Sequence, residues 1–289
     1  MSCKNKKLPQ IFAAAAVMAA VSAVPAFAAS GWKMEGNRWV YLDKKGDRVT
    51  ETWKKSTGDN WFYLDSDGYM AVNKLIEDGD DYYYVNENGA RVSNEWRRLE
   101  DDSDDGVYTD GNCWYYFGGN GKAVKNDSGQ AKLTAIDGKK YAFSDTGKML
   151  YGWVSEAGTM ITDDSDWASG LISCGEEDSG VAAVGKWAFL EIDDPEADND
   201  AEGYWFYFGT NGKKTVNSTK TINGKKYQFD ERGVAQFKWH AASASSASAS
   251  EYKYYNSPEQ CWMASGGFQA VPSEGMNADA YRDEKMHWC

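Results

Sequence analysis

The residues best suited to binding a ligand in this sequence are aromatic. The chain of 289 residues contains 13 Trp and 18 Tyr, and many of these rings come in pairs two residues apart, as in Trp39 and Tyr41 or Trp61 and Tyr63. Successive side chains of a β-strand point to opposite faces, so residues at this spacing share one face. A face of indole and phenol rings attracts a quaternary ammonium group. The same rings can also stack on pyranose sugars.

Residues suited to catalysis are few. The sequence has two histidines, His240 and His287, and it contains no Ser nucleophile elbow, phosphate-binding loop or His-x-x-x-His metal pair. Paired carboxylates could cleave a glycan, but the acidic residues fall in loops of a repetitive chain with no separate core to hold them. We therefore expect a protein that is not an enzyme, with no catalytic residue, cofactor or metal site.

The composition argues against several other classes. Leu, Ile, Val and Phe make up about 15% of the chain, so most of its apolar area lies in aromatic rings, and neither a Leu-rich bundle nor a doubly wound α/β fold is expected. The net charge of −13 argues against a nucleic-acid partner, because phosphate binding needs clustered Lys and Arg. A surplus of carboxylates instead favours a cationic ligand.

Short aromatic strands, each followed by a turn with Gly, carry these rings from end to end of the chain. We predict that each strand pairs with a short second strand after the turn, such as 48–50 or 91–93, to form a hairpin. The basic repeat is about 21 residues, and a lone hairpin is marginal in water, so the copies must stack. The predicted fold is all-β, a solenoid of stacked β-hairpin repeats with acidic loop insertions. The copies lie at 39–46, 61–68, 82–89, 114–121, 141–147, 205–212 and 227–233, with an eroded copy at 171–180.

The two faces of each strand have different expected roles. The face that carries Val40 and Leu42 is apolar in nearly every copy, which predicts the stacking core. The opposite face keeps both rings in five copies but carries Ala142 and Gln228 in two others. A face that loses its rings while the hairpin persists is not essential to the fold, so its rings are available for a ligand.

These residues resemble the choline-binding, or cell-wall-binding, repeats of Gram-positive surface proteins. The resemblance covers about residues 31–239 and implies a left-handed superhelix of hairpins. It further implies that choline groups of teichoic acid lie between successive hairpins, each boxed by two Trp of one repeat, a Tyr of the next and often a Met. The segments that carry the likeness are 31–33, 39–43, 60–65, 136–141, 147–153 and 222–227.

Carried over position by position, the resemblance implies two complete boxes. Residues Trp32 and Trp39 with Tyr63 form the first, and Trp53 and Trp61 with Tyr84 form the second, while Met70 occupies the Met position of the family. The alternative is that all these rings are structural.

Other intervals depart from the family pattern, which leaves choline binding by them in doubt. Leu75 stands where the copy containing Tyr82 should have its first Trp. Two more intervals have both Trp residues but face Ala142 or Gln228 in the next copy, and their possible ligand-binding residues are Trp96, Trp114, Tyr116, Trp187, Trp205 and Tyr207.

The N-terminal segment predicts export. Residues 1–28 read as a signal peptide, because three Lys precede an apolar run at 11–24 and small residues stand at Ala26 and Ala28. We expect secretion, non-covalent association with the cell wall at the cell surface, and no later membrane span. The expected mature chain comprises repeats at 29–240, a Ser/Ala-rich linker at 241–250 and a partial or atypical further repeat at 251–289.

Two features of the mature chain stay open. The acidic insertions at 100–105 and 191–202 could hold calcium but are better read as solvated loops. Four cysteines allow three disulfide pairings, between which the sequence does not choose: Cys113, Cys174, Cys261 and Cys289.

The favoured function is that of a secreted, non-catalytic cell-wall-binding protein whose aromatic cages hold the choline groups of teichoic acid. One alternative is a module that binds glucan or another neutral polysaccharide of the wall. Another is a repeat scaffold for a protein partner. Free choline should release the protein from walls in the first case, soluble glucan should do so in the second, and neither competitor should act in the third.

Overall fold

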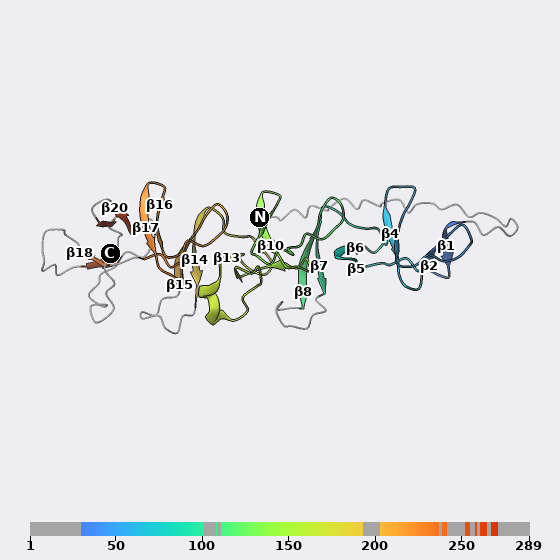
Figure 1. The fold of residues 1–289 in the computed structure, drawn as a ribbon, viewed down its shortest axis with the longest axis horizontal. Coiled ribbons are helices and arrows are strands. Elements are labelled where there is room, and N and C mark those ends of the chain that lie inside the picture. The colour runs from blue at the N-terminus through green and yellow to red at the C-terminus, as the bar shows by residue number, and fades with distance from the viewer. Residues whose placement is uncertain are drawn as a thin grey trace, which may run out of the picture. The chain divides into compact units, whose positions relative to one another are not determined.

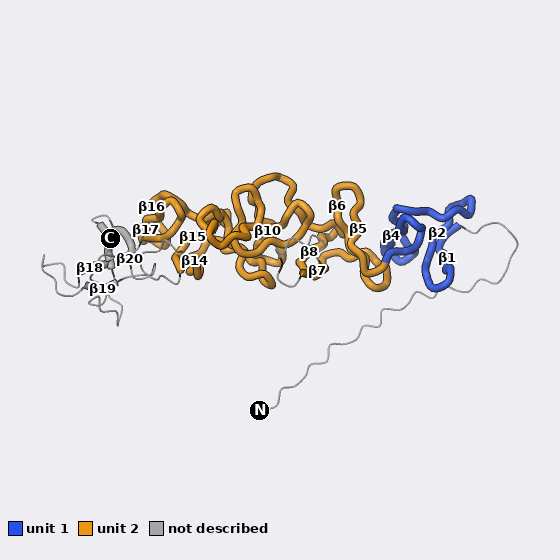
Figure 2. Tube along the Cα trace, turned by 90° about the horizontal axis from the view of Figure 1, so that it is seen from below, with its two compact units in different colours: residues 1–71 blue, residues 72–289 orange. Residues whose placement is uncertain are grey.

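The computed structural model describes residues 30–100, 108, 111–192, 203–236 and 258, and four later strands as backbone only. The described chain falls into two compact units, which we call unit 1 (residues 1–71) and unit 2 (residues 72–289) (Figure 2). The predicted signal peptide, most of the two acidic insertions, the linker from 242 onward and Cys289 lie outside the described residues.

Unit 1 contains two antiparallel β-hairpins. In the first, β1 (Gly31–Glu35) pairs with β2 (Arg38–Leu42), and in the second, β3 (Thr52–Lys55) pairs with β4 (Trp61–Leu64) (Figure 1). Each aromatic strand is thus the second strand of its hairpin.

Unit 2 continues the same pattern, and its hairpins follow one another in chain order (Figures 1 and 2). The 3₁₀ helix η1 (Asp164–Ser169) lies between the two strands of one hairpin. The paired strands are β5 (Lys74–Asp78) with β6 (Asp81–Val85), β7 (Glu95–Glu100) with β8 (Asn112–Phe117), β9 (Leu133–Ile136) with β10 (Lys139–Phe143), β12 (Trp153–Val154) with β13 (Ile172–Ser173), β14 (Lys186–Glu191) with β15 (Gly203–Phe208), and β16 (Ser218–Ile222) with β17 (Lys225–Phe229). The short strand β11 (Met149–Leu150) pairs with the other edge of β10.

Four further strands follow. The strand β18 (Trp239–Ala241) pairs with β19 (Tyr252–Tyr254). The strand β20 (Cys261–Ala264) pairs with β17 and with β21 (Gly267–Ala270), which extends the last hairpin to a four-stranded sheet.

The all-β hairpin array is confirmed. The predicted pairing with a strand after the glycine turn is found for β10 and β11 but is wrong for the other aromatic strands. The aromatic strand closes a hairpin with the strand before it, and the segments at 48–50 and 91–93 contribute only isolated bridges, Leu42 to Arg48 and Val85 to Arg91. Two-residue turns explain the difference. Asp137 and Gly138 have φ values of 48° and 78° between β9 and β10, which is the geometry that turns a tight hairpin without splaying its strands.

The glycine turn after β4, like the turns after β8, β13, β15 and β17, returns the chain to the preceding hairpin. In unit 1 the backbone N–H of Met70 donates to the carbonyl oxygen of Trp39 at 2.8 Å, and that of Ala71 donates to Tyr63 at 2.8 Å. Because these bonds use only the backbone, hairpins stay linked even where outer-face rings are replaced. The matching bonds in unit 2 run from Ala123 to Tyr82, Ala182 to Lys140, Lys214 to Leu171 and Ala235 to Trp205.

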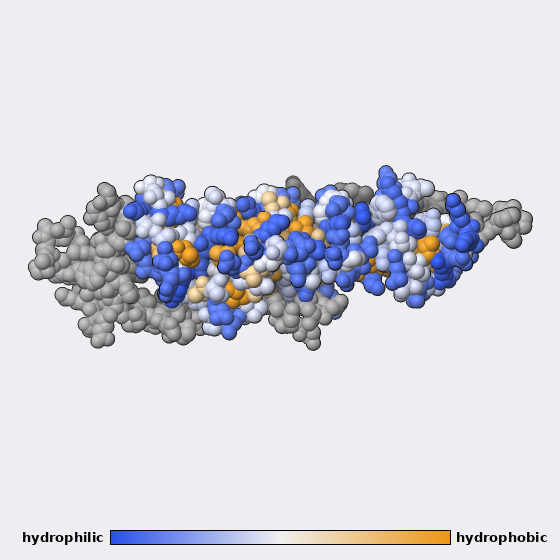
Figure 3. Space-filling model, viewed as in Figure 1, coloured by the Kyte–Doolittle hydropathy of each residue, from blue (hydrophilic) through white to orange (hydrophobic). Residues whose placement is uncertain are grey.

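The inner faces of the strands form the core, as predicted. The side chains of Val40, Leu64 and Val85 are fully buried, as are those of the Phe residues at the same positions in later copies, whereas the outer-face rings are only half-buried. Two cysteines, Cys113 and Cys174, are also fully buried, in different core clusters. On the face of unit 2 seen in Figure 3, hydrophilic residues cover most of the surface and apolar residues gather in small patches between them.

Burial makes Cys174 chemically inert. Desolvation raises the pKa of its thiol to about 12, so the thiol stays protonated at neutral pH. Its position in a packed cluster is that of a small apolar residue.

Candidate functional site

The first predicted box lies within unit 1, where the indole of Trp32 packs against rings of two hairpins. In the β1–β2 register Trp32 lies opposite Tyr41, with ring centroids 5.4 Å apart. Its indole also meets the ring of Phe62 in the next hairpin at 5.4 Å, edge to face. The indole Nε1 of Trp32 is buried and has no hydrogen-bond partner among the described residues. Trp32, a predicted wall of the box, is therefore a packing contact between hairpins.

The other members of this box lie on adjoining segments. The returning segment 69–71 bridges to β2 through Val40 and Tyr69, and its next two residues bond to the backbone of Trp39 and Tyr63. The backbone thus brings the positions of Trp39, Tyr63 and Met70 together.

Cations of the chain already lie over some neighbouring rings. The guanidinium carbon of Arg38 lies 3.2 Å from the ring centroid of Tyr69, and the ammonium of Lys54 lies 5.2 Å from that of Tyr41. Hydrogen bonds from Arg48 and then Arg38 lower the pKa of Tyr69. The outer-face rings of unit 1 are therefore in an environment that accepts positive charge.

The second predicted box draws on both units. Trp53 lies opposite Tyr63 in the β3–β4 register, with ring centroids 5.1 Å apart, and Trp61 is half-buried on the same strand as Tyr63. Its remaining member, Tyr84, belongs to unit 2, where its hydroxyl donates to the side chain of Asn73 at 3.3 Å. This box stays a prediction.

In two intervals of unit 2 the first Trp packs against the core of the next hairpin. The ring centroid of Trp96 lies 4.8 Å from that of Tyr141 and 5.9 Å from that of Phe143. Trp187 repeats this arrangement, at 4.7 Å from Tyr227 and 5.5 Å from Phe229. These two indoles are structural contacts between neighbouring hairpins.

The remaining rings of these intervals are half-buried. Trp114 has its indole Nε1 buried without a partner among the described residues, and Tyr116 lies 5.1 Å from Trp96. Trp205 meets Phe189 at 5.5 Å. The ammonium of Lys220 lies 5.2 Å from the ring centroid of Tyr207, so a cation of the chain covers that ring.

Sequence reasoning missed a repeat at 151–160. Gly158 closes a turn in it, with φ of 81°, and the repeat ends in a Val154 to Met160 bridge like those of the other copies. Its Trp153 and the neighbouring Trp167 line a hollow of about 200 Å³ together with carboxylates of Asp163, Asp164 and Glu191. The Gly-Trp pair at 152–153 was the available signal.

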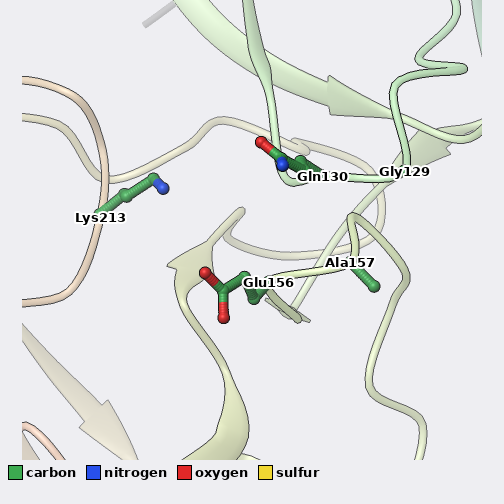
Figure 4. A pocket seen from close by; sticks show the side chains of 5 residues that line it. All are labelled: Gly129, Gln130, Glu156, Ala157 and Lys213. Atoms are coloured by element: carbon green, nitrogen blue, oxygen red, sulfur yellow. The ribbon is translucent and has the colours of Figure 1, made fainter.

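A second hollow has a different lining. It has a volume of about 430 Å³, and Glu156 and Lys213 extend toward it from different segments (Figure 4). Its other lining residues are Gly129, Gln130 and Ala157, so none of the described residues around it supplies a ring face for an ammonium group.

Two family models match the sequence. The choline-binding repeat matches residues 49–96, and the putative cell wall binding repeat matches residues 108–123. Residues 49–96 therefore carry the choline-binding repeat pattern. Of the predicted box residues, only Trp32 and Trp39 precede the first match, which contains Trp53, Trp61, Tyr63, Met70 and Tyr84.

Solved structures with a similar fold come from Streptococcus pneumoniae. The choline-binding domain of CbpL is 21% identical, with a TM-score of 0.44, over 72% of this chain and 87% of that one. Choline binding protein F is 19% identical with a TM-score of 0.44, and the modular autolysin LytC is 18% identical with a TM-score of 0.46. This chain covers 57% of the length of choline binding protein F and 50% of that of LytC. No curated protein matches it.

No helix in the part of the chain that the structure describes is long and apolar enough to cross a membrane.

Proposed function

We propose that this protein is a secreted, non-catalytic cell-wall-binding protein whose choline-binding repeats hold the choline groups of teichoic acid. The observation that carries the proposal is the pair of backbone hydrogen bonds from Met70 to Trp39 and from Ala71 to Tyr63. They link the backbone of the returning segment to two ring positions of the predicted box, and Trp32 lies on the strand that pairs with the strand of Trp39.

The chemistry of this box suits a quaternary ammonium. Such a group has no hydrogen-bond donor, and each desolvated ring face contributes up to about 2 kcal/mol to holding it. The net charge of −13 adds a general attraction for a cationic ligand. Several weak sites on one chain that engage one polymer reach high avidity without any further contact.

Binding of neutral glucan is the second candidate, since the same half-buried rings can stack on sugars. The half-buried state of Trp39, Tyr63 and Trp61 supports this reading as well. The two candidates differ in which soluble competitor releases the protein.

A pull-down of residues 29–289 on purified choline-containing cell walls tests the proposal. We expect free choline to release the protein and dextran to leave it bound. Trp39→Ala and Trp61→Ala should each weaken retention, whereas Phe189→Ala, at a ring that is 45% exposed and outside the boxes, should not. Release by dextran alone would favour the glucan reading, and retention insensitive to both competitors would favour a protein partner.

A further inference from the structure

A lysine occupies an aromatic cage in the middle of unit 2. The ammonium nitrogen of Lys214 lies 5.0 Å from the ring centroid of Trp153, 5.7 Å from that of Phe206 and 5.9 Å from that of Trp167. It donates a hydrogen bond to the carbonyl oxygen of Ala168 at 2.9 Å. Lys214 is only 5% exposed, and among the described residues no carboxylate forms an ion pair with it.

Three elements build this cage. Trp153 comes from β12, Trp167 from η1 and Phe206 from the inner face of β15, and their ring centroids lie 5.3 to 5.9 Å apart where they meet. Gly170, directly after η1, allows the close approach, because a Cβ there would lie 2.5 Å from the indole of Trp153. The cage is therefore a packed feature of the fold.

The repeat pattern places Lys214 where unit 1 has Met70. Each is the second residue after its turn glycine, bridges to the last residue of its aromatic strand, and donates its backbone N–H to the preceding repeat. The rings correspond as well, because Trp153 meets Phe206 at 5.3 Å just as Trp32 meets Phe62 at 5.4 Å.

The amine carries its charge under ordinary conditions. Burial lowers the pKa of Lys214 to about 8. The charge of Asp230 opposes this shift, whereas that of Arg232 adds to it. The protonated form is thus in roughly tenfold excess at pH 7. Rings and one carbonyl oxygen are the groups that receive this ammonium, which are the partners an organic cation would use.

We propose that this interval is a cation-binding cage that the chain fills with its own ammonium group, so that Lys214 acts as a tethered internal ligand. The cage then links β12, η1 and β15 and is closed to soluble ligands. Shortening Lys214 opens a site for a small organic cation such as tetramethylammonium. The proposal holds whether or not other intervals bind choline.

Counting the tetramethylammonium ions bound per chain by equilibrium dialysis tests the proposal. We compare residues 29–289 with their Lys214→Ala and Lys213→Ala variants, because Lys213 is the exposed neighbour of Lys214. We expect Lys214→Ala to bind one ion more than the other two proteins. An equal number in a folded Lys214→Ala variant overturns the proposal. If the unchanged protein binds no tetramethylammonium, the choline proposal fails. The comparison of Lys214→Ala with the unchanged protein still tests the cage.

Acetylation of the unchanged protein gives a readout that needs no variant to fold. With limiting acetic anhydride and peptide mass spectrometry, we expect Lys214 to react at least tenfold more slowly than Lys213. Equal rates would show that the ammonium of Lys214 is not enclosed and would also overturn the proposal.

Discussion

Two intervals of this protein share one backbone plan and differ in what can occupy them. In unit 1, Trp32 and Phe62 meet beside a turn that returns with Met70, and in unit 2, Trp153 and Phe206 meet beside a turn that returns with Lys214. A neutral side chain leaves an aromatic box without a cation of its own, whereas a lysine supplies one. We therefore expect the second position after the glycine turn to decide whether a repeat binds an external cation or an internal one.

The largest effect on stability should come from removing the inner-face Phe that both intervals have, Phe62 in unit 1 and Phe206 in unit 2. Phe206 is fully buried and meets both Trp153 and Trp167, whereas Phe62 is half-buried. We expect Phe206→Ala to lower the free energy of unfolding by about 3–5 kcal/mol and Phe62→Ala by about half as much, because the cavity is larger in the enclosed site. Urea unfolding followed by tryptophan fluorescence measures both values. Equal losses would show that the two intervals are packed alike.

The pH dependence of stability should also separate the intervals. The pKa of Lys214 is about 8 in the folded protein, below the ordinary lysine value of 10.5. The unfolded chain therefore binds more protons between these pH values, so the free energy of unfolding contributed by Lys214 rises as the pH increases from 8 to 10.5, by at most about 3 kcal/mol.

Comparison with Lys214→Ala isolates this contribution. Tyrosines that titrate in the same range are common to both proteins, so their effects cancel in the difference. The difference between the two curves of unfolding free energy against pH should slope upward over this window. A flat difference would show that the pKa of Lys214 is not lowered in the folded protein.

The smallest predicted effect comes from a lysine placed in the unit 1 interval at the position of Met70, which matches Lys214 of unit 2. Met70→Lys should place an ammonium beside Trp32 and Trp39, where it competes with free choline at a high effective concentration. We expect at least tenfold weaker choline binding at this interval, with Met70→Leu as the size-matched neutral control. Equal choline affinity in the lysine and leucine variants would remove the role assigned to this position.

Much of the fold followed from the sequence because local patterns set it. The alternation of Val40 and Leu42 with Trp39 and Tyr41 separates core from outer face, and the burial of these residues agrees. For most copies the predicted pairing partner is wrong, because two-residue turns such as Asn223-Gly224 lie before the aromatic strands and form the hairpins there.

The site was less predictable, because it depends on contacts between distant segments. Insertions separate Trp153, Trp167 and Phe206 in the chain, so spacing alone did not group them. Nothing in the sequence marks Lys214 as buried, since lysines rarely are. Aligning Gly68-Tyr69-Met70 with Gly212-Lys213-Lys214 would have revealed its position but not its cage.

The central claim is that aromatic boxes between hairpins bind choline. Isothermal titration of residues 29–289 with choline chloride tests it most directly, alongside the Trp39→Ala/Trp61→Ala double variant. The account predicts saturable binding by the unchanged protein and loss of at least one site in a folded double variant. Absence of binding, or an unchanged number of sites in the double variant, would contradict it.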